Sequence, residues 1–258
     1  MSSLDPTRSL PPLKSFSLTH ILYDPTHPLS IPLTLLSLTP IFLFVSYLTL
    51  LIFTRRLTIV FLALGSISNE ALNLVLKRIW RADRPWKGHG EVGEGYGMPS
   101  SHTQAAAFLV AWSIGYALTS ERRYAQGTKL SGRLALVRSV REGVWVFGVV
   151  LWSILVAYSR WHLHYHSPLQ ILAGYCAGLL AGSIYFFLTE YLPLYHPTSL
   201  PGRVRDGIEY IWRGIGGVGG WQLGGADGGW GEGWLLGSGS DAQGPSKEIS
   251  GARIKKRA

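Results

Sequence analysis

Cysteine and charged residues are scarce in this chain of 258 residues. Cys176 is the only cysteine, which excludes an intrachain disulfide framework and a cysteine-based zinc cluster. It lies in an apolar run and is interpreted as a packing residue. Charged residues make up 15% of the chain and hydrophobic residues 47%, a balance unlike that of an ordinary soluble domain. The composition therefore favours a polytopic membrane protein.

A signal peptide, an internal repeat and a nucleic-acid-binding face are also lacking. The first 28 residues contain no basic patch followed by an apolar run, so the first membrane span is expected to direct targeting. The formal net charge is +9, but no soluble domain remains to present a basic face. We therefore expect no nucleic-acid partner and interpret the basic residues as topology signals.

Long apolar runs are what the chain has in quantity. A helix needs about 20 apolar residues to cross a bilayer, and the runs near that length predict an all-α, polytopic bundle of about five transmembrane helices. The expected spans are Pro32 to Phe53, Leu57 to Ile79, His102 to Thr119, Val144 to Tyr158 and Pro168 to Leu188. We divide the chain into an amino-terminal segment (1–28), a transmembrane domain (29–190) and a tail (191–258).

Basic residues between the spans predict the orientation of the bundle. Six of them fall in the expected loop 120–143, namely Arg122, Arg123, Lys129, Arg133, Arg138 and Arg141. The positive-inside rule places this loop and the tail in the cytoplasm. The loops 80–101 and 159–167 are then expected on the outer or lumenal face.

The tail changes in composition from Gly202 onward, where Gly, Ser and Trp dominate. We find no apolar periodicity there and expect disorder. The tail tryptophans fit either an interfacial position or a flexible tail with incidental aromatics; they are Trp212, Trp221, Trp230 and Trp234. The end of the chain, Lys255 to Ala258, resembles the dilysine retrieval signal of endoplasmic reticulum membrane proteins.

Two clusters on the predicted outer face carry groups that a phosphate requires. Six residues separate Lys77 from Arg84-Pro85. A lysine charge and an arginine fork can neutralise a phosphate dianion, although such residues also serve as interfacial anchors.

The second cluster, Pro99-Ser100-Ser101-His102, precedes an apolar helix. Ser101 and Gln104 predict a capping box, and a helix amino terminus is an anion site. Ser100 adds a donor, and His102 is suited to general-acid catalysis; both serines also fit simple capping.

A third cluster consists of Ser159-Arg160, five residues, and then His166. Ser167, Pro168 and Gln170 predict a capping box that opens the last span directly after His166. The partial positive charge of the helix start favours neutral imidazole, which is the form that can attack phosphorus. Two other histidines of the loop, His162 and His164, compete for this role and lack the spacing from Arg160.

In this order, Lys-x6-Arg-Pro, Pro-Ser-x-His and Ser-Arg-x5-His resemble the motifs of the type 2 phosphatidic acid phosphatase superfamily, which also includes vanadium haloperoxidases and bacterial acid phosphatases. The resemblance implies a helical phosphatase that needs neither a metal nor another cofactor. It implies a phosphohistidine at His166 and protonation of the leaving group by His102. The residues implied to bind phosphoryl oxygens are Lys77, Arg84, Ser100, Ser101 and Arg160.

Two positions depart from the superfamily pattern. Ser101 replaces the glycine of Pro-Ser-Gly-His, and Gln170 replaces an aspartate that normally orients the nucleophile. The stretches 96–102 and 165–170 carry the same substitutions as the dolichyl diphosphatase branch. The early stretch 18–25 is also similar to that branch, so the resemblance covers roughly residues 18 to 190.

The branch implies hydrolysis of dolichyl diphosphate to dolichyl phosphate and inorganic phosphate at the lumenal face of the endoplasmic reticulum. This reaction would recycle the lipid carrier of protein N-glycosylation. The implied partners are the lipid substrate and the bilayer; protein partners stay unknown. The alternatives are a phosphatase for phosphatidate, sphingosine phosphate or isoprenyl diphosphates, and a non-catalytic scaffold or transporter. Membrane spans disfavour a haloperoxidase.

Glu70 is a candidate support for the site. Glu70, Asn73 and Lys77 share one face of the second expected span. A charge inside a bilayer is costly, so such a residue is usually paired or functional. One hypothesis pairs Glu70 with Lys77 or another cation; the other has a protonated Glu70 hydrogen-bonded between helices. Gln170 is the second candidate support residue.

Overall fold

Helices make up almost all regular structure in the residues described by the computed structural model, which are 14–16, 21–85, 95–125, 132–221 and 223. The expected all-α fold is confirmed, with one short antiparallel strand pair before it, β1 (Lys14–Phe16) and β2 (Ile21–Tyr23). The helices are α1 (Ser30–Leu36), α2 (Thr39–Thr54), α3 (Leu57–Trp80), α4 (Ser101–Leu118), α5 (Ser120–Ala125), α6 (Gly132–His162), α7 (Pro168–Phe186), α8 (Leu192–Tyr195) and α9 (Leu200–Gly214).

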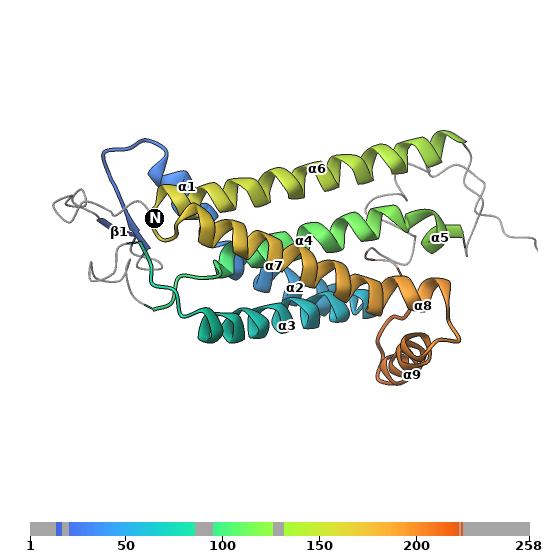
Figure 1. The fold of residues 1–258 in the computed structure, drawn as a ribbon. Helices are drawn as coiled ribbons and strands as arrows, with labels where there is room; N and C mark the ends of the chain where they lie inside the picture. The colour runs from blue at the N-terminus through green and yellow to red at the C-terminus, as the bar shows by residue number, and fades with distance from the viewer. Residues whose placement is uncertain (1–13, 17–20, 86–94, 126–131, 222, 224–258) are drawn as a thin grey trace, which may run out of the picture. The chain divides into compact units, whose positions relative to one another are not determined.

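Helix α4 forms the centre of the bundle, with α3, α6 and α7 packed along it (Figure 1). Eleven of its residues are buried, among them Phe108 and Trp112. Phe186 of α7 and Tyr47 of α2 join these side chains in the main hydrophobic core. Because α4 is enclosed by protein, it can carry polar residues such as Gln104 and Ser113 that a lipid-facing helix would not tolerate.

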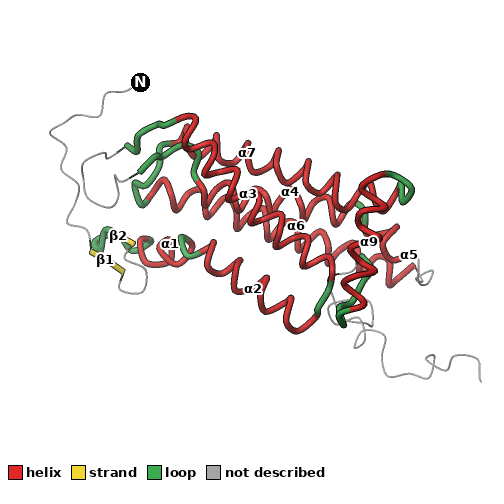
Figure 2. Tube along the Cα trace, turned by 90° about the horizontal axis from the view of Figure 1, so that it is seen from below, coloured by secondary structure: helices red, strands yellow, loops and turns green. Residues whose placement is uncertain are grey.

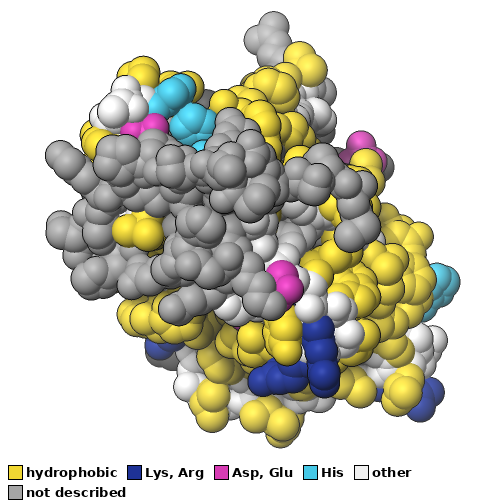
Figure 3. Space-filling view, turned by 60° about the vertical axis from the view of Figure 1, so that its left-hand side comes forward, with side chains coloured by type: hydrophobic (Ala, Val, Ile, Leu, Met, Phe, Trp, Pro, Cys, Tyr) yellow, Lys and Arg dark blue, Asp and Glu magenta, His cyan; other side chains and the backbone are white. Residues whose placement is uncertain are grey.

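Among the described residues, three helices are long and apolar enough to cross a membrane, or four if the bent pair α1–α2 counts as one span. They are Leu57–Trp80, Leu136–His162 and Pro168–Tyr195. With the enclosed α4 added, the bundle has about the expected number of spanning helices. Large apolar side chains are exposed along these helices, and hydrophobic side chains dominate the described surface in Figure 3. The bundle is therefore built to lie in a bilayer.

One predicted span is bent, and one predicted boundary is wrong. The first span is bent by 44° between α1 and α2. The fourth helix begins at Gly132 rather than Val144, so the expected loop 120–143 consists largely of α5 and the start of α6. That stretch lies between two apolar runs, but arginine is a good helix former and does not interrupt backbone hydrogen bonding, so the helix extends beyond the apolar part.

Glycines bring α7 against α4. A Cβ atom at Gly174 would lie 2.6 Å from the backbone oxygen of Ser100, and one at Gly182 would lie 2.6 Å from that of Phe108. At Gly178 it would overlap the backbone oxygen of Gln104. Small residues spaced by four allow such close contact of membrane helices. Cys176 lies between these glycines but is exposed, so its interpretation as a packing residue is wrong.

The disorder expected from Gly202 onward is contradicted as far as Leu223. After α7, a π-helical turn (Phe187–Tyr191) and α8 lead to α9, which is seen end-on in Figure 1. The periodicity missed in the sequence is an apolar stripe with spacings of three and four, exposed on α9: Leu200, Val204, Ile208, Ile211 and Ile215. The rest of the tail, including Trp230, Trp234 and the dilysine-like end, lies outside the described residues.

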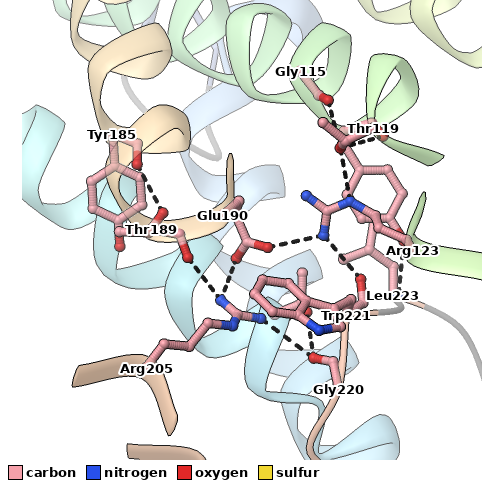
Figure 4. Close-up of polar contacts among 12 residues, drawn as sticks. Gly115, Thr119, Arg123, Tyr185, Thr189, Glu190, Arg205, Gly220, Trp221 and Leu223 are labelled. Carbon is pink, nitrogen blue, oxygen red and sulfur yellow. Dashed lines mark hydrogen bonds and ion pairs between the residues drawn. The ribbon is translucent and has the colours of Figure 1, made fainter. Parts of the chain in front are cut away.

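The segment after α9 returns to the bundle. Val218 pairs with the α2–α3 connection, through Val218 N–H to the Arg55 carbonyl (2.8 Å) and Leu57 N–H to the Val218 carbonyl (2.9 Å). A buried ion cluster holds the same region (Figure 4). Glu190 accepts from Arg123 at 3.0 Å and from Arg205 at 2.8 Å, with all three side chains at most 2% exposed. The chain up to Leu223 is thus part of the folded unit.

Candidate active site

The sequence-predicted site residues gather at one end of the bundle, where α3 and α6 end and α4 and α7 begin. This is the left-hand end of the helices in Figure 1. The residues brought together there are Lys77, Arg84, Ser100, Ser101, His102, Arg160 and His166. The short connections between these helices carry almost all of them, so the topology alone makes the three sequence clusters neighbours.

His166 is buried and its ring is fixed in one tautomer. Its Nδ1 atom lies 2.9 Å from the carbonyl oxygen of Gly97. A carbonyl oxygen only accepts, so Nδ1 carries the proton. The backbone N–H of His166 donates to the Arg160 carbonyl at 3.2 Å. The Nε2 atom therefore keeps the lone pair that a nucleophile requires.

Gln170 lies within side-chain hydrogen-bond reach of His166 and also supports it through the neighbouring loop. Its Nε2 donates to the Asp83 carbonyl at 2.7 Å, and Asp83 pairs with Tyr96 in an antiparallel bridge. Gly97 follows in the same segment and is in such close contact with Gln170 that a Cβ atom there would lie 2.5 Å from the amide. Gln170 thus holds the loop whose Gly97 carbonyl orients the imidazole. The backbone carbonyl stands in for the aspartate of the superfamily pattern.

The predicted capping box at the start of α7 is confirmed. Ser167 Oγ accepts from the Gln170 N–H at 3.3 Å, and Gln170 Oε1 accepts from the Ser167 N–H at 3.2 Å. Pro168 occupies the first helical turn. The side-chain amide of Gln170 therefore has two roles: its oxygen caps the helix, and its nitrogen binds the Asp83 loop.

Three cations surround His166. Burial and the positive charges of Arg160, Arg84 and Lys77 lower the pKa of His166 to about 3. The imidazole is therefore neutral at physiological pH. The same cations would attract a phosphate dianion to Nε2, which matches the roles that the resemblance implies for them.

Ser37 is a site residue that the sequence did not reveal. It lies at the bend between α1 and α2, where its hydroxyl accepts from Arg160 Nη1 at 3.0 Å. Arg160 also stacks over the Tyr165 ring, 4.1 Å from its centroid. Ser37 stands in an apolar run with no motif around it. Only the fold brings it to Arg160, 123 positions away in the chain.

His102 is also held by Ser37. Its Nε2 atom lies 3.0 Å from the Ser37 carbonyl oxygen, so Nε2 carries a proton and donates it to that carbonyl. Its Nδ1 atom lies 3.5 Å from Ser101 Oγ. His102 is within electrostatic range of Arg160, His166 and Lys77. Nδ1 is then the ring nitrogen left to exchange a proton with a ligand.

The predicted capping box at Ser101 is wrong. Ser100 occupies the N-cap position, with no side-chain capping bond. The side chain of Gln104 instead accepts from Asn73 at 2.8 Å and donates to Asn69 Oδ1 at 3.0 Å, because a buried amide must satisfy its hydrogen bonds with the neighbouring helix. Ser100 Oγ accepts from Thr103 at 3.1 Å, which leaves the Ser100 proton for an anion at the helix start.

Glu70 lies near this site but forms no ion pair with Lys77 in the described part of the chain. It is exposed and lines a cavity together with Ser101 and His102. Asn73, the next residue on the predicted face, turns inward to Gln104 and the Pro99 carbonyl. Glu70 therefore lies on the His102 side of the site.

The competing histidines lie elsewhere. His162 packs edge-on against His27, with ring centroids 4.6 Å apart, and near Tyr158. His164 has a positive φ of 62° at the turn after α6. It is His166 whose ring contacts the Gly97 carbonyl. Within the described residues, no group of three His, Cys, Asp or Glu side chains could hold a metal ion.

Comparison with known proteins identifies the family of this chain. The model of the PAP2 superfamily matches residues 56–193. Dolichyldiphosphatase of Saccharomyces cerevisiae is 34% identical over 180 residues, which are 67% of this chain and 69% of the yeast protein. Dolichyldiphosphatase 1 of Homo sapiens is 37% identical over 176 residues, 67% of this chain and 71% of the human one. No solved structure matches the chain significantly. The chain belongs to the PAP2 superfamily and is a membrane phosphatase of the dolichyldiphosphatase family.

Proposed function

We propose that this protein hydrolyses dolichyl diphosphate to dolichyl phosphate and inorganic phosphate, through a phosphohistidine at His166. The observation that carries the proposal is the Nδ1–H bond from His166 to the Gly97 carbonyl at 2.9 Å. It leaves Nε2 unprotonated and close to three cations. The names of the relatives support dolichyl diphosphate as the substrate, and the geometry supports His166 as the nucleophile.

The first chemical step is transfer of the terminal phosphoryl group. His166 Nε2 attacks the terminal phosphorus and the bond to the bridging oxygen breaks. His102 gives a proton from Nδ1 to that oxygen, so dolichyl phosphate departs. Lys77, Arg84 and Arg160, with the Ser100 hydroxyl, the Ser101 hydroxyl and the N–H groups at the start of α4, bind the charge that develops on the phosphoryl oxygens.

The second step restores the enzyme. Water attacks the phosphohistidine and gives its proton to His102, the nitrogen–phosphorus bond breaks, and phosphate leaves. His166 returns to its neutral form and His102 to its protonated form. Ser37 acts as a positioning residue in both steps, because its carbonyl fixes the His102 ring and its hydroxyl fixes Arg160.

The proposed location is the endoplasmic reticulum membrane, with the site on the lumenal face. Arg123 of α5, with Arg138 and Arg141 in the first part of α6, lies at the opposite end of the bundle from His166. The positive-inside rule then favours a cytoplasmic position for that end. An epitope at the carboxyl terminus should be reached by antibody after selective permeabilisation of the plasma membrane. Labelling only after the internal membranes are opened would reverse the orientation.

The test of the function is phosphate release from dolichyl diphosphate by purified protein without added metal. Loss of the nucleophile should reduce turnover by more than about 10³-fold in His166→Ala. A label on the terminal phosphate should be trapped on wild-type protein as an acid-labile, base-stable adduct. His162→Ala, which removes a histidine of the same loop outside the site, is the matched control. Normal turnover in His166→Ala would overturn the proposal, and faster hydrolysis of phosphatidate would reassign the substrate.

The same assay tests the two support residues. Gln170→Ala should lower turnover because the Gly97 carbonyl is no longer held against His166, whereas Gln170→Glu keeps the cap acceptor and loses the donor to Asp83. Glu70→Gln should change the pH profile if the carboxylate acts on His102 or a cation. An unchanged rate and profile would remove Glu70 from the site.

A further inference from the structure

A cavity of about 610 Å³ lies between α2 and α3, with α4 as its floor. Its walls run from Pro40 to Leu51 on α2 and from Val60 to Glu70 on α3. At a rise of 1.5 Å per residue, the α2 wall is about 16 Å long. The cavity is therefore an elongated slot within the membrane-spanning part of the bundle.

The slot has an apolar body and one polar end. Apolar side chains, most often leucine, form most of the walls, and Tyr47 and Ser66 bond to each other at 3.3 Å. Glu70, Ser101 and His102 lie together at the end towards the active site. Such a lining suits a hydrocarbon chain that carries a polar group at one end.

The slot opens on the leaving-group side of the site. His102 lines it, whereas His166 and Arg160 do not. In the proposed reaction the lipid is attached to the phosphate that His102 protonates, so the chain must leave the site past His102. The Glu70 carboxylate would repel a phosphate placed in the slot, which keeps the diphosphate on the arginine side.

Helix α2 closes the slot only loosely. It lies at the edge of the bundle (Figure 2) and follows the bend after α1. Thr39 and Tyr47 are its only buried residues. Many of its other apolar side chains, such as Phe44 and Leu48, are exposed. Tyr47 is the buried α2 residue that belongs to the main hydrophobic core, so a chain in the bilayer can enter from the side by displacing α2 with little loss of core packing.

We propose that this slot binds the isoprenoid chain of the substrate next to the diphosphate, and that α2 and α3 determine the preference for chain length. The proposal rests on the proposed function and adds to it a binding site for the lipid. Since the slot is far shorter than a dolichyl chain, the remainder extends into the bilayer between α2 and α3.

The test fills the slot without touching the reacting groups. Ala63 lies in the α3 wall, about 10 Å from Glu70 at 1.5 Å per residue, and Ala63→Phe narrows the slot there. Ala71→Phe is the matched control, because Ala71 is exposed on the same helix outside the slot. Hydrolysis is measured for isopentenyl, farnesyl and long-chain polyprenyl diphosphates.

Ala63→Phe should reduce kcat/KM for the long chain by at least about tenfold, with unchanged hydrolysis of isopentenyl diphosphate. Ala71→Phe should match the wild type on all three. Equal long-chain activity in both variants would overturn the proposal and leave the slot to bilayer lipid. If the wild type hydrolyses no polyprenyl diphosphate, the proposed function itself fails.

A second measurement does not depend on the folding of a variant. A non-hydrolysable diphosphonate with a photoreactive group on its second isoprene unit is irradiated with wild-type protein. Labelled peptides from α2 and α3 support the slot. Labelling confined to α6 or α7 would overturn it.

Discussion

The proposed nucleophile, Nε2 of His166, is kept unprotonated by a backbone carbonyl and by three neighbouring cations. The Gly97 carbonyl holds the proton on Nδ1, and burial with Arg160, Arg84 and Lys77 lowers the pKa to about 3. A carbonyl cannot stabilise an imidazolium as a carboxylate does. The proposed nucleophile is thus neutral before a substrate binds, and in the proposed reaction the phosphate dianion supplies the compensating charge.

The low pKa of His166 makes a prediction for the pH dependence of kcat/KM. The neutral form is active, so activity present above the pKa is lost as the pH falls through about 3, well below the range of an ordinary histidine near 6.5. In Arg84→Gln one cation is removed, the pKa rises, and the acid limb should move to higher pH than in the wild type. Arg84→Lys keeps the charge and is the control. Ionisation of the substrate is common to all three proteins, so coincident acid limbs would contradict this electrostatic account.

At the scale of elements, α4 and α7 form one rigid pair. Gly174, Gly178 and Gly182 let the α7 backbone lie directly against α4, and the Ser100 N–H donates to the Gln170 carbonyl at 3.2 Å where the pair begins. This places the anion-binding start of α4 beside the cap that follows His166. Helix packing thereby sets the distance between the second and third sequence motifs.

A methyl group at Gly178 should disturb this pair. Its Cβ would overlap the Gln104 backbone oxygen and lie 2.8 Å from Ala107 Cβ, so Gly178→Ala should destabilise the protein by about 1–3 kcal/mol. Gly148→Ala is the control, because a Cβ there meets nothing within 4 Å and the change favours a helix. Thermal unfolding in detergent should show a lower Tm for the first variant only. A Tm equal to that of Gly148→Ala would show that α7 can shift freely.

At the scale of the whole molecule, the end of the bundle away from the site is closed by the chain after α7. Arg205 stacks over Trp221, 3.8 Å from the ring centroid, and bonds to Glu190, while Arg123 of α5 also bonds to Glu190 (Figure 4). Two arginines share one carboxylate in a dry environment. Removal of one partner leaves an uncompensated charge, which is more costly than the pair is stabilising.

The buried cluster should therefore be sensitive to loss of its carboxylate. Glu190→Gln leaves Arg123 and Arg205 without a counter-charge and should cost about 3–5 kcal/mol. The exposed pair of Arg213 and Glu209 on α9 is the control, since Arg213→Gln should cost at most about 1 kcal/mol. Tm and protease cleavage near α9 report both effects. Similar Tm values for the two variants would mean that the cluster does not hold the tail.

Much of the site was predictable because its signals are local. The spacing of Lys77 and Arg84, the Ser100 to His102 turn and the Ser167–Gln170 cap depend on residues close in the chain, and their residue types state their chemistry. The apolar runs likewise predicted a helical membrane bundle. The apolar stripe on α9 is equally local, but the glycine-rich composition of the tail predicts disorder, whereas the spacing of its apolar residues predicts a helix.

The sequence by itself determined the fold class and the family, and it supplied the reacting residues that we propose, through periodicity, caps and motif spacing. Only the tertiary structure decided that Gly97 orients His166, that Ser37 binds both His102 and Arg160, and that α2 leaves a slot beside His102. The physical reason is that a backbone carbonyl or a cavity wall can be supplied by almost any residue. Such contacts leave no residue-type signature, and they exist only once distant helices have packed.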